Sequence, residues 1–364
     1  MRIFTFVSLV FFFNSLNAQT FSDKLEKQSV LEVAEKVADW QLAHPTGIDL
    51  WNWKYGAFYS GLMDVYLVDP KIKYLKSMVE MGNTYNWAIF PRPYDANVLA
   101  IGHMYIDLYN ILKDPKIIDK TGYCLDANFQ RYQSTPDVKF IGNRYWHNWW
   151  SWCDALYMAP PTYAKYAAAT GQIKYLDKMD ELYRITYDYL YDKEEKLFFR
   201  DDSFFEKRTP TGKKIFWARG NGWVIAGLVK VLQVMPRDYR NVKFYETLFM
   251  EMASRLKELQ QNEGYWPTSL LDPSHFGGIE TSGTTFYCYA LAFGINNGYL
   301  NKTDYLPTVE NSWKLLVKCV QADGRLGYVQ KVGDSPGAVT SDDSNSYGSG
   351  AFLSAASEVA KLSK

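Results

Sequence analysis

Two aspartates stand directly before apolar stretches with helical periodicity, and both have aromatic neighbours. Asp154 follows three tryptophans within residues 149–152, and Asp95 ends the segment Arg92-Pro93-Tyr94-Asp95. Indole rings around a carboxyl group exclude water, which raises its pKa and favours the protonated acid near neutral pH. A general acid needs that protonated state. Paired carboxyl groups in a sugar-sized cleft are typical of glycoside hydrolysis, so we hypothesise that Asp154 and Asp95 are catalytic.

Helix capping is the alternative interpretation of both aspartates. Asp is favoured where a helix begins, because its carboxylate accepts hydrogen bonds from the free backbone N–H groups there. Capping explains the position of each carboxylate, but it does not explain the tryptophans before Asp154. The residue types alone leave both interpretations open.

Residues 217–223 combine an arginine, two tryptophans and two glycines. Arg219 offers a planar fork suited to a carboxylate, and the rings of Trp217 and Trp223 offer faces on which a sugar can stack. The glycines on either side of Asn221 suit backbone with positive φ, where successive N–H groups can bind an anion. The segment therefore predicts a uronic-acid subsite. A structural turn, with Arg219 paired to a neighbouring aspartate, is the alternative.

Two more segments carry candidate sugar contacts. Arg200, in the segment Phe199-Arg200-Asp201, is a second candidate partner for an anion, with an outer salt bridge as the alternative. Tyr55 belongs to the aromatic cluster of residues 51–56, and we expect it to contact substrate.

These segments belong to a pattern that occurs six times: an apolar helical stretch that begins after a cluster of aromatic, glycine and charged residues. The starts are residues 51–56, 92–95, 149–154, 217–223, 280–283 and 346–350. Five of the stretches end in a polar turn and are followed by a second, amphipathic helical pattern. Repeated pairs of an apolar and an amphipathic helix predict an all-α fold, an (α/α)6 barrel with six inner and six outer helices.

The barrel brings the candidate residues to one end. Consecutive inner helices are neighbours, so the carboxyl groups of Asp95 and Asp154 are expected to face the same cavity. We see no linker or shift in composition, which predicts one catalytic domain over residues 19–364.

The composition of the chain argues against some classes of binding partner and favours another. Lys and Arg total 40 and so do Asp and Glu, with no basic stripe, which argues against nucleic-acid and membrane-surface binding. The 12 Trp, 28 Tyr and 21 Phe suit a cleft that stacks on sugar rings, so an oligosaccharide is the expected partner. Oligomeric state cannot be predicted.

Residues 1–18 have the pattern of a secretory signal peptide: Arg2, an apolar run, and small residues before position 19. The apolar run is shorter than the roughly 20 residues that a membrane-spanning helix needs. A membrane anchor is therefore the less favoured alternative. We expect an exported protein, periplasmic or secreted.

The cysteines and histidines do not indicate a metal or cofactor site. The four cysteines form no CxxC pair, and buried free thiols are favoured over disulfides, whose pairing the spacing does not give. The four histidines show no HxxxH or HxH spacing, so no metal is expected. No glycine-rich nucleotide loop is present, and no cofactor is expected.

Five motifs, in this order along the chain, carry a resemblance to a known family. They are Asp95-x7-His103-Met104-Tyr105, residues 152–161 (WCDALYMAPP), residues 219–223 (RGNGW), residues 269–273 (SLLDP) and residues 280–283 (ETSG). Together they resemble the unsaturated rhamnogalacturonyl hydrolases of glycoside hydrolase family 105, with the unsaturated glucuronyl hydrolases of family 88 as more distant relatives.

The resemblance implies an (α/α)6 barrel that removes a 4-deoxy-4,5-unsaturated uronic acid from lyase-generated oligosaccharides, without metal or cofactor. It implies that Asp154 is the acid/base that protonates C4 of the vinyl ether, and that Asp95 is the second essential carboxylate. The implied uronate contacts are Trp217, Arg219 and Trp223, with Trp152 as the aromatic wall beside the acid. His103 stands where Gln is common, and Arg200 lies in a loop that carries a His in some members.

Two other function classes stay open. A polysaccharide lyase on the same barrel would create the double bond. Lyases usually need a Tyr or His base; tyrosines are plentiful here, but the two most specific motifs, residues 152–161 and 219–223, contain no His. A non-catalytic sugar-binding protein would explain the aromatic residues but not the pair Asp95 and Asp154. The parent polymer, pectic rhamnogalacturonan or sulfated ulvan, cannot be predicted.

Overall fold

The computed structural model describes residues 21–46, 49, 52–90, 92, 94–130 and 135–362. The predicted signal peptide, residues 1–18, lies outside the described residues. Within them the chain is predominantly helical, and its two strands, β1 (Tyr191–Asp192) and β2 (Leu197–Phe198), form a short antiparallel hairpin. None of the helices in this part of the chain has the length and apolar character to cross a membrane.

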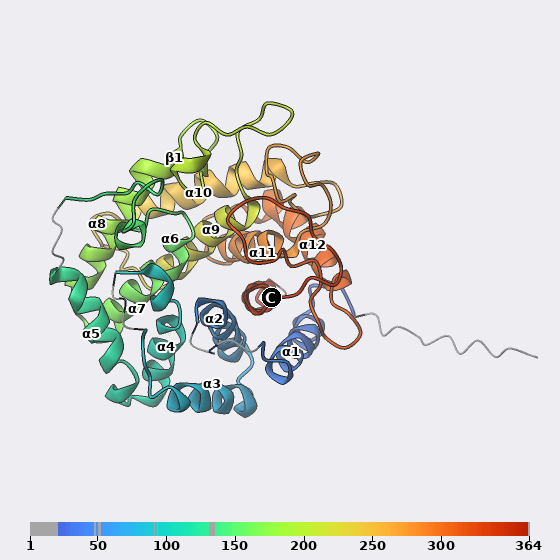
Figure 1. The fold of residues 1–364 in the computed structure, drawn as a ribbon. Coiled ribbons are helices and arrows are strands. Elements are labelled where there is room, and N and C mark those ends of the chain that lie inside the picture. The colour runs from blue at the N-terminus through green and yellow to red at the C-terminus, as the bar shows by residue number, and fades with distance from the viewer. Residues whose placement is uncertain are drawn as a thin grey trace, which may run out of the picture.

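The inner helices of the described chain form a closed ring (Figure 1). They are α2 (Trp53–Val68), α4 (Gly102–Leu112), α7 (Pro160–Thr170), α9 (Ala218–Leu232), α11 (Thr281–Asn296) and α13 (Ser346–Val359). Each contacts the next in this order, and α13 returns to contact α2. The predicted all-α (α/α)6 barrel is confirmed, and each predicted start lies at or just before an inner helix or the short helix that precedes it.

The outer helices lie around this ring (Figure 1). They are α1 (Lys27–Ala43), α3 (Ile72–Thr84), α5 (Asp119–Ala127), α8 (Ile173–Leu190), α10 (Val242–Leu259) and α12 (Lys302–Lys318). Five of them follow the polar turns seen in the sequence. The sixth, α1, precedes the first repeat and packs on α13, so the two ends of the helical array meet.

Short helices carry the chain between these elements. They are α6 (Ala155–Met158), η1 (Ala96–Leu99), η2 (Pro115–Ile117), η3 (Asn128–Gln130), η4 (Trp146–Trp149) and η5 (Asp202–Phe204). Both predicted catalytic aspartates immediately precede such a helix, Asp95 before η1 and Asp154 before α6.

Glycines allow the inner helices to approach closely. A Cβ on Gly61 of α2 would lie 1.9 Å from the carbonyl oxygen of Gly350 in α13. No side chain can occupy that space, so the two helices pack backbone against backbone. This contact fixes the junction at which α13 closes the ring against α2.

A buried ion pair links three inner helices. Lys230 of α9 is fully buried, and its Nζ lies 2.8 Å from Oδ2 of Asp64 in α2. The hydroxyl of Ser354 in α13 donates to the same carboxylate oxygen at 2.6 Å. A buried charge needs such partners, because its desolvation is costly without them.

Candidate active site

Asp154 is the N-cap residue of α6, but its side chain makes no capping hydrogen bond. The carboxyl group is 13% exposed. Because the carboxylate is not used to cap the helix, the capping interpretation does not explain its presence. The start of α6 therefore positions the Asp154 side chain but leaves its carboxyl group free of capping bonds.

Burial raises the pKa of the Asp154 carboxyl group above its ordinary value, and the positive charges of Arg200 and Arg219 partly oppose this rise. Arg200 Nε lies 3.9 Å from Asp154 Oδ2. The thiol of Cys153 donates a hydrogen bond to the same oxygen at 3.4 Å. The direction of the shift is the one expected from the surrounding tryptophans, and it favours the protonated acid.

Asp95 has a different environment, in which both carboxylate oxygens have partners. Its Oδ1 accepts a hydrogen bond from the backbone N–H of Asn97 at 3.0 Å, which caps η1. Its Oδ2 lies 3.3 Å from Nη1 of Arg92. The side chain is only 4% exposed. Asp95 therefore does act as a helix cap, and it also forms an ion pair with Arg92.

The two aspartates lie at the same end of the barrel. The helices that follow them, η1 and α6, contact each other. The Asp154 carboxyl group is desolvated and makes no capping bond, whereas the Asp95 carboxyl group caps η1 and pairs with Arg92. Two acidic groups with environments of this kind can divide the roles of proton donor and stabilising anion.

A cleft of about 230 Å³ opens beside Asp95. It is lined by Asp49, Asn52, Trp53, Phe90, Arg92, Asn97 and Val98. The Trp53 ring stacks on Tyr347 at 5.6 Å and meets the edge of Trp223 at 6.2 Å. The lining combines two aromatic rings with four polar or charged side chains, a mixture that suits a sugar ring.

Near Asp154, Arg200 lies among aromatic rings. Trp152 is 2% exposed and meets Trp146 in an edge contact at 4.7 Å. The Arg200 guanidinium lies over the Phe140 ring at 4.8 Å and bonds Asp201 at 2.5 Å. Arg200 is thus not an outer salt bridge, because it is largely buried and faces Asp154.

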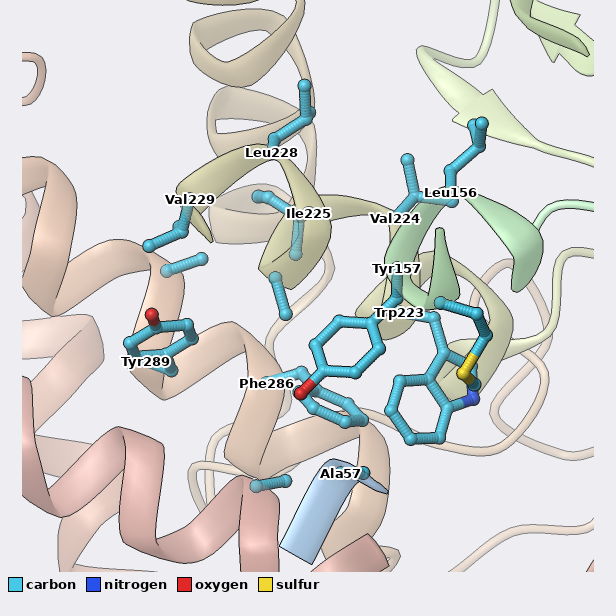
Figure 2. Packing of buried hydrophobic residues seen from close by; sticks show 14 of the residues in the cluster. Ala57, Leu156, Tyr157, Trp223, Val224, Ile225, Leu228, Val229, Phe286 and Tyr289 are labelled. Carbon is cyan, nitrogen blue, oxygen red and sulfur yellow. The ribbon is translucent and has the colours of Figure 1, made fainter. Parts of the chain in front are cut away.

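Trp217 and Trp223 are buried at the start of α9. Figure 2 shows the Trp223 indole beside the rings of Tyr157 and Phe286, with which it makes contacts at 4.7 Å and 4.4 Å. The Trp217 indole N–H donates to the side chain of Gln330 at 2.7 Å. Both rings are almost completely buried in this conformation, and their predicted stacking on substrate stays a prediction.

Arg219 is 2% exposed and is held by the loop that precedes α13. Its Nη1 donates to the Gln330 carbonyl at 3.0 Å, and its Nη2 donates to the Lys331 carbonyl at 2.9 Å. The guanidinium also lies 4.2 Å from the Trp217 ring. The predicted aspartate partner is therefore not observed among the described residues, and the contact with a uronate stays a prediction.

Arg219→Lys tests which of these roles dominates. An ammonium group cannot reach both carbonyls of the loop in the same geometry, so we expect a lower melting temperature. If Arg219 also contacts the uronate, kcat/KM falls roughly ten- to hundred-fold as well, the size of one lost charge-assisted hydrogen bond. A variant with wild-type melting and wild-type kcat/KM would contradict both roles.

The side chains of His103 and Tyr55 are buried and have partners within the protein. His103 is fully buried, and its ring nitrogens face the Ser60 hydroxyl at 3.4 Å and the Met158 carbonyl at 3.2 Å. Burial lowers the His103 pKa well below its ordinary value, so the ring is neutral. The Tyr55 hydroxyl instead accepts a hydrogen bond from the backbone of Thr46 at 2.7 Å. The substrate contacts predicted for both residues stay predictions.

The anion-binding nest predicted around Asn221 is wrong. Gly220 and Gly222 lie within α9, and neither has positive φ. Glycine fits at both positions because neighbouring side chains are close. A Cβ at Gly220 would lie 3.1 Å from the Cys153 sulfur, and a Cβ at Gly222 would lie 3.0 Å from the Phe286 ring. The pattern of two glycines therefore reflects helix packing.

Three residues that sequence reasoning did not single out also belong to this region. Gln330 connects Trp217 and Arg219, Tyr347 stacks on Trp53, and Arg92 pairs with Asp95. Gln330 lies in a loop with no local motif, so only the three-dimensional contact identifies it. In the described part of the chain, no group of three or more His, Cys, Asp or Glu side chains is arranged to hold a metal.

Comparison with known proteins identifies the family. Residues 23–363 match the family model described as Glycosyl Hydrolase Family 88. The chain belongs to this family. A relative from Formosa agariphila, named unsaturated 3S-rhamnoglycuronyl hydrolase, is 42% identical over 339 residues, which cover 90% of this chain and 89% of the relative. The resemblance to families 105 and 88 and the glycosidase class, both expected from the sequence, are confirmed.

Solved structures agree with this fold over nearly the whole chain. A family 88 glycosyl hydrolase from Bacteroides vulgatus is 30% identical, with a TM-score of 0.84, and the match covers 93% of this chain and 99% of that one. A protein described as a polysaccharide lyase is 32% identical, with a TM-score of 0.83, and the match covers 92% of this chain and 98% of that one.

Proposed function

We propose that this protein removes the 4-deoxy-4,5-unsaturated uronic acid from the non-reducing end of uronyl-rhamnose oligosaccharides left by polysaccharide lyases. The name of the Formosa agariphila relative supports a rhamnoglycuronyl substrate. The observation that carries the proposal is the Asp154 carboxyl group, which is buried at a helix start, makes no capping bond and has a raised pKa.

The reaction that suits this geometry is hydration of the C4=C5 double bond. Protonated Asp154 gives its proton to C4 of the vinyl ether, and a water molecule adds at C5 after losing a proton to the Asp154 carboxylate. The hemiketal then opens at the C5–O5 bond to give a ketone at C5, which leaves C1 as a hemiacetal. Collapse of this hemiacetal to an aldehyde breaks the glycosidic bond, and the departing oxygen takes the hemiacetal proton as the shortened oligosaccharide is released. Because the double bond is attacked, the separation of the two carboxyl groups does not predict retention or inversion at the anomeric carbon.

Asp95 contributes a fixed negative charge in this proposal. The Asn97 N–H and the Arg92 guanidinium hold both of its oxygens. A carboxylate held in this way is suited to stabilise positive charge that develops on the sugar ring during protonation. Trp53 and Phe90 in the neighbouring cleft provide apolar surfaces for the sugar rings.

Absorbance measurements test the proposal directly. With a chelator present, the purified protein should bleach the ultraviolet absorbance of unsaturated uronyl-rhamnose oligosaccharides and leave saturated ones intact. Glucuronyl and galacturonyl ends, each with and without rhamnose sulfate, distinguish ulvan-derived from rhamnogalacturonan-derived substrates. Failure to bleach any unsaturated oligosaccharide would refute the proposed function.

Lyase activity is the second candidate, because one similar structure is described as a polysaccharide lyase. A lyase would increase the absorbance of intact polysaccharide instead of bleaching its fragments. The buried, neutral His103 has both ring nitrogens engaged and cannot serve as the base of a lyase in this conformation. The hydrolase is therefore favoured.

The pattern of residues 1–18 supports export to the periplasm or the exterior. An exported enzyme would meet oligosaccharide fragments outside the cytoplasm. N-terminal sequencing of the protein recovered from the periplasm or the medium of expressing cells tests this, with cleavage expected before Gln19. Recovery of the uncleaved chain would contradict it.

A further inference from the structure

The two oxygens of the Asp154 carboxyl group have different surroundings. Oδ2 faces both the Cys153 thiol, at 3.4 Å, and Arg200 Nε, at 3.9 Å. In the described part of the chain, no side chain donates a hydrogen bond to Oδ1. The capping bond that could have used Oδ1 is also not made. Among the described side chains, those that contact the carboxyl group therefore do so at Oδ2.

Cys153 is placed to act on this oxygen. The side chain is fully buried, and burial, together with the nearby Asp154 charge, raises the pKa of its thiol well above the ordinary value. The thiol therefore keeps its proton and serves as a hydrogen-bond donor. The missing side chain at Gly220 gives the sulfur its space, since a Cβ there would lie 3.1 Å from it.

The backbone of Cys153 also fixes the second partner of Oδ2. Its N–H donates to the carbonyl of Arg200 at 2.8 Å. The Arg200 guanidinium is held in turn by Asp201 at 2.5 Å, and among the described residues the buried Arg200 Nε has no hydrogen-bond partner. One residue thus connects the loop that carries Arg200 to the segment that carries Asp154.

We infer that Cys153 is a positioning residue for the proposed hydration reaction. Its thiol, together with Arg200, holds Oδ2 of Asp154, so that Oδ1 is the oxygen that exchanges the proton with substrate. The inference rests on the proposed function for its catalytic meaning. The hydrogen bond itself can be measured without turnover.

Loss of the Cys153 thiol should shift the pH dependence of kcat/KM in a defined direction. A donor at Oδ2 stabilises ionised Asp154 and lowers its pKa, so removal of the thiol raises that pKa. Protonated Asp154 is the active form, and kcat/KM falls as pH rises through its pKa. Without the thiol, activity should therefore extend to higher pH.

Several other charged and titratable groups surround Asp154 and Cys153, and the substitutions at Cys153 leave them unchanged. Arg200 faces Asp154 from the loop after β2, and Arg219 faces it from α9. Three further groups interact electrostatically with Cys153. They are Asp201, which is bonded to Arg200, and the tyrosines Tyr183 on α8 and Tyr287 on α11. None of these five residues is changed in the test.

The test compares Cys153→Ala, Cys153→Ser and the control Cys124→Ala, which removes another buried thiol from outer helix α5. The pKa of Asp154 is followed by ¹³C NMR of aspartate-labelled protein, with Asp154→Asn identifying the signal. We expect Cys153→Ala to raise it by roughly 0.3–1 unit, the size of one lost hydrogen bond. The basic limb of kcat/KM should move by the same amount.

Cys153→Ser keeps a donor, so its Asp154 pKa should stay at or below the wild-type value. Cys124→Ala should leave both measurements unchanged. If Cys153→Ala titrates like wild type, the inference is overturned; if that variant does not fold, a Cys153→Ser pKa above wild type overturns it. An NMR shift without any bleaching by the wild-type protein would refute the proposed function but not the hydrogen bond.

Discussion

Asp154→Asn is expected to reduce turnover of unsaturated uronyl oligosaccharides by roughly 10²–10⁴-fold, the usual loss when a general acid is removed. The amide has the shape of the carboxyl group but no transferable proton. Arg200 and Cys153 remain beside it. Initial rates of bleaching at saturating and limiting substrate give kcat and kcat/KM. Near-normal turnover would mean that Asp154 is not the acid.

The same substitution should not destabilise the fold at neutral pH. Burial raises the pKa of Asp154, so its contribution to stability is fully present below the unfolded pKa and is lost as pH rises through the folded pKa. Asn carries no such penalty. We expect the variant to melt at or above the wild-type temperature at pH 7, and the difference to shrink toward acid pH. A clear loss of stability would indicate a structural role.

Lys230→Met is expected to lower the free energy of unfolding by about 3–5 kcal/mol. The substitution leaves the Asp64 carboxylate buried at the junction of α2, α9 and α13. Among the described residues it then keeps only the Ser354 hydroxyl as a hydrogen-bond partner, and an uncompensated buried charge is costly. Urea unfolding followed by circular dichroism measures the loss.

Two controls separate the charge from the packing. The double variant Lys230→Met with Asp64→Asn removes both charges and should recover most of the lost stability. Lys73→Met breaks the exposed pairs with Glu35 and Asp39 and should cost less than about 1 kcal/mol. If Lys230→Met is as mild as Lys73→Met, the buried pair does not hold these helices together.

Most of the barrel could be predicted because each inner helix carries a local signal. Residues 217–223 and 280–283, for example, mark the starts of α9 and α11, and apolar sequence follows directly. Helix α1 was not identified because it precedes the first repeat. Its place as the sixth outer helix depends on its contact with α13, more than 300 positions along the chain.

The candidate site could be predicted only where side-chain chemistry depends on close neighbours in sequence. Asp154 and Trp152 are two residues apart, so the desolvated carboxyl group could be expected. Arg219 could not be placed, because its partners Gln330 and Lys331 come from a distant loop. His103 follows Asp95 by eight residues, yet it is buried in the core, since helical periodicity does not show which side of an all-round buried helix faces the site.

The closed ring also constrains the order in which the chain can fold. Helix α13, residues 346–359, fills the gap between α1, α2 and α11. Until it arrives, the almost continuous apolar surface of α2 has no partner on one side, and neither has α11. Contacts between such distant segments form slowly, because a long loop must close first. The partly assembled ring is therefore the state most exposed to aggregation, and it persists until α13 docks.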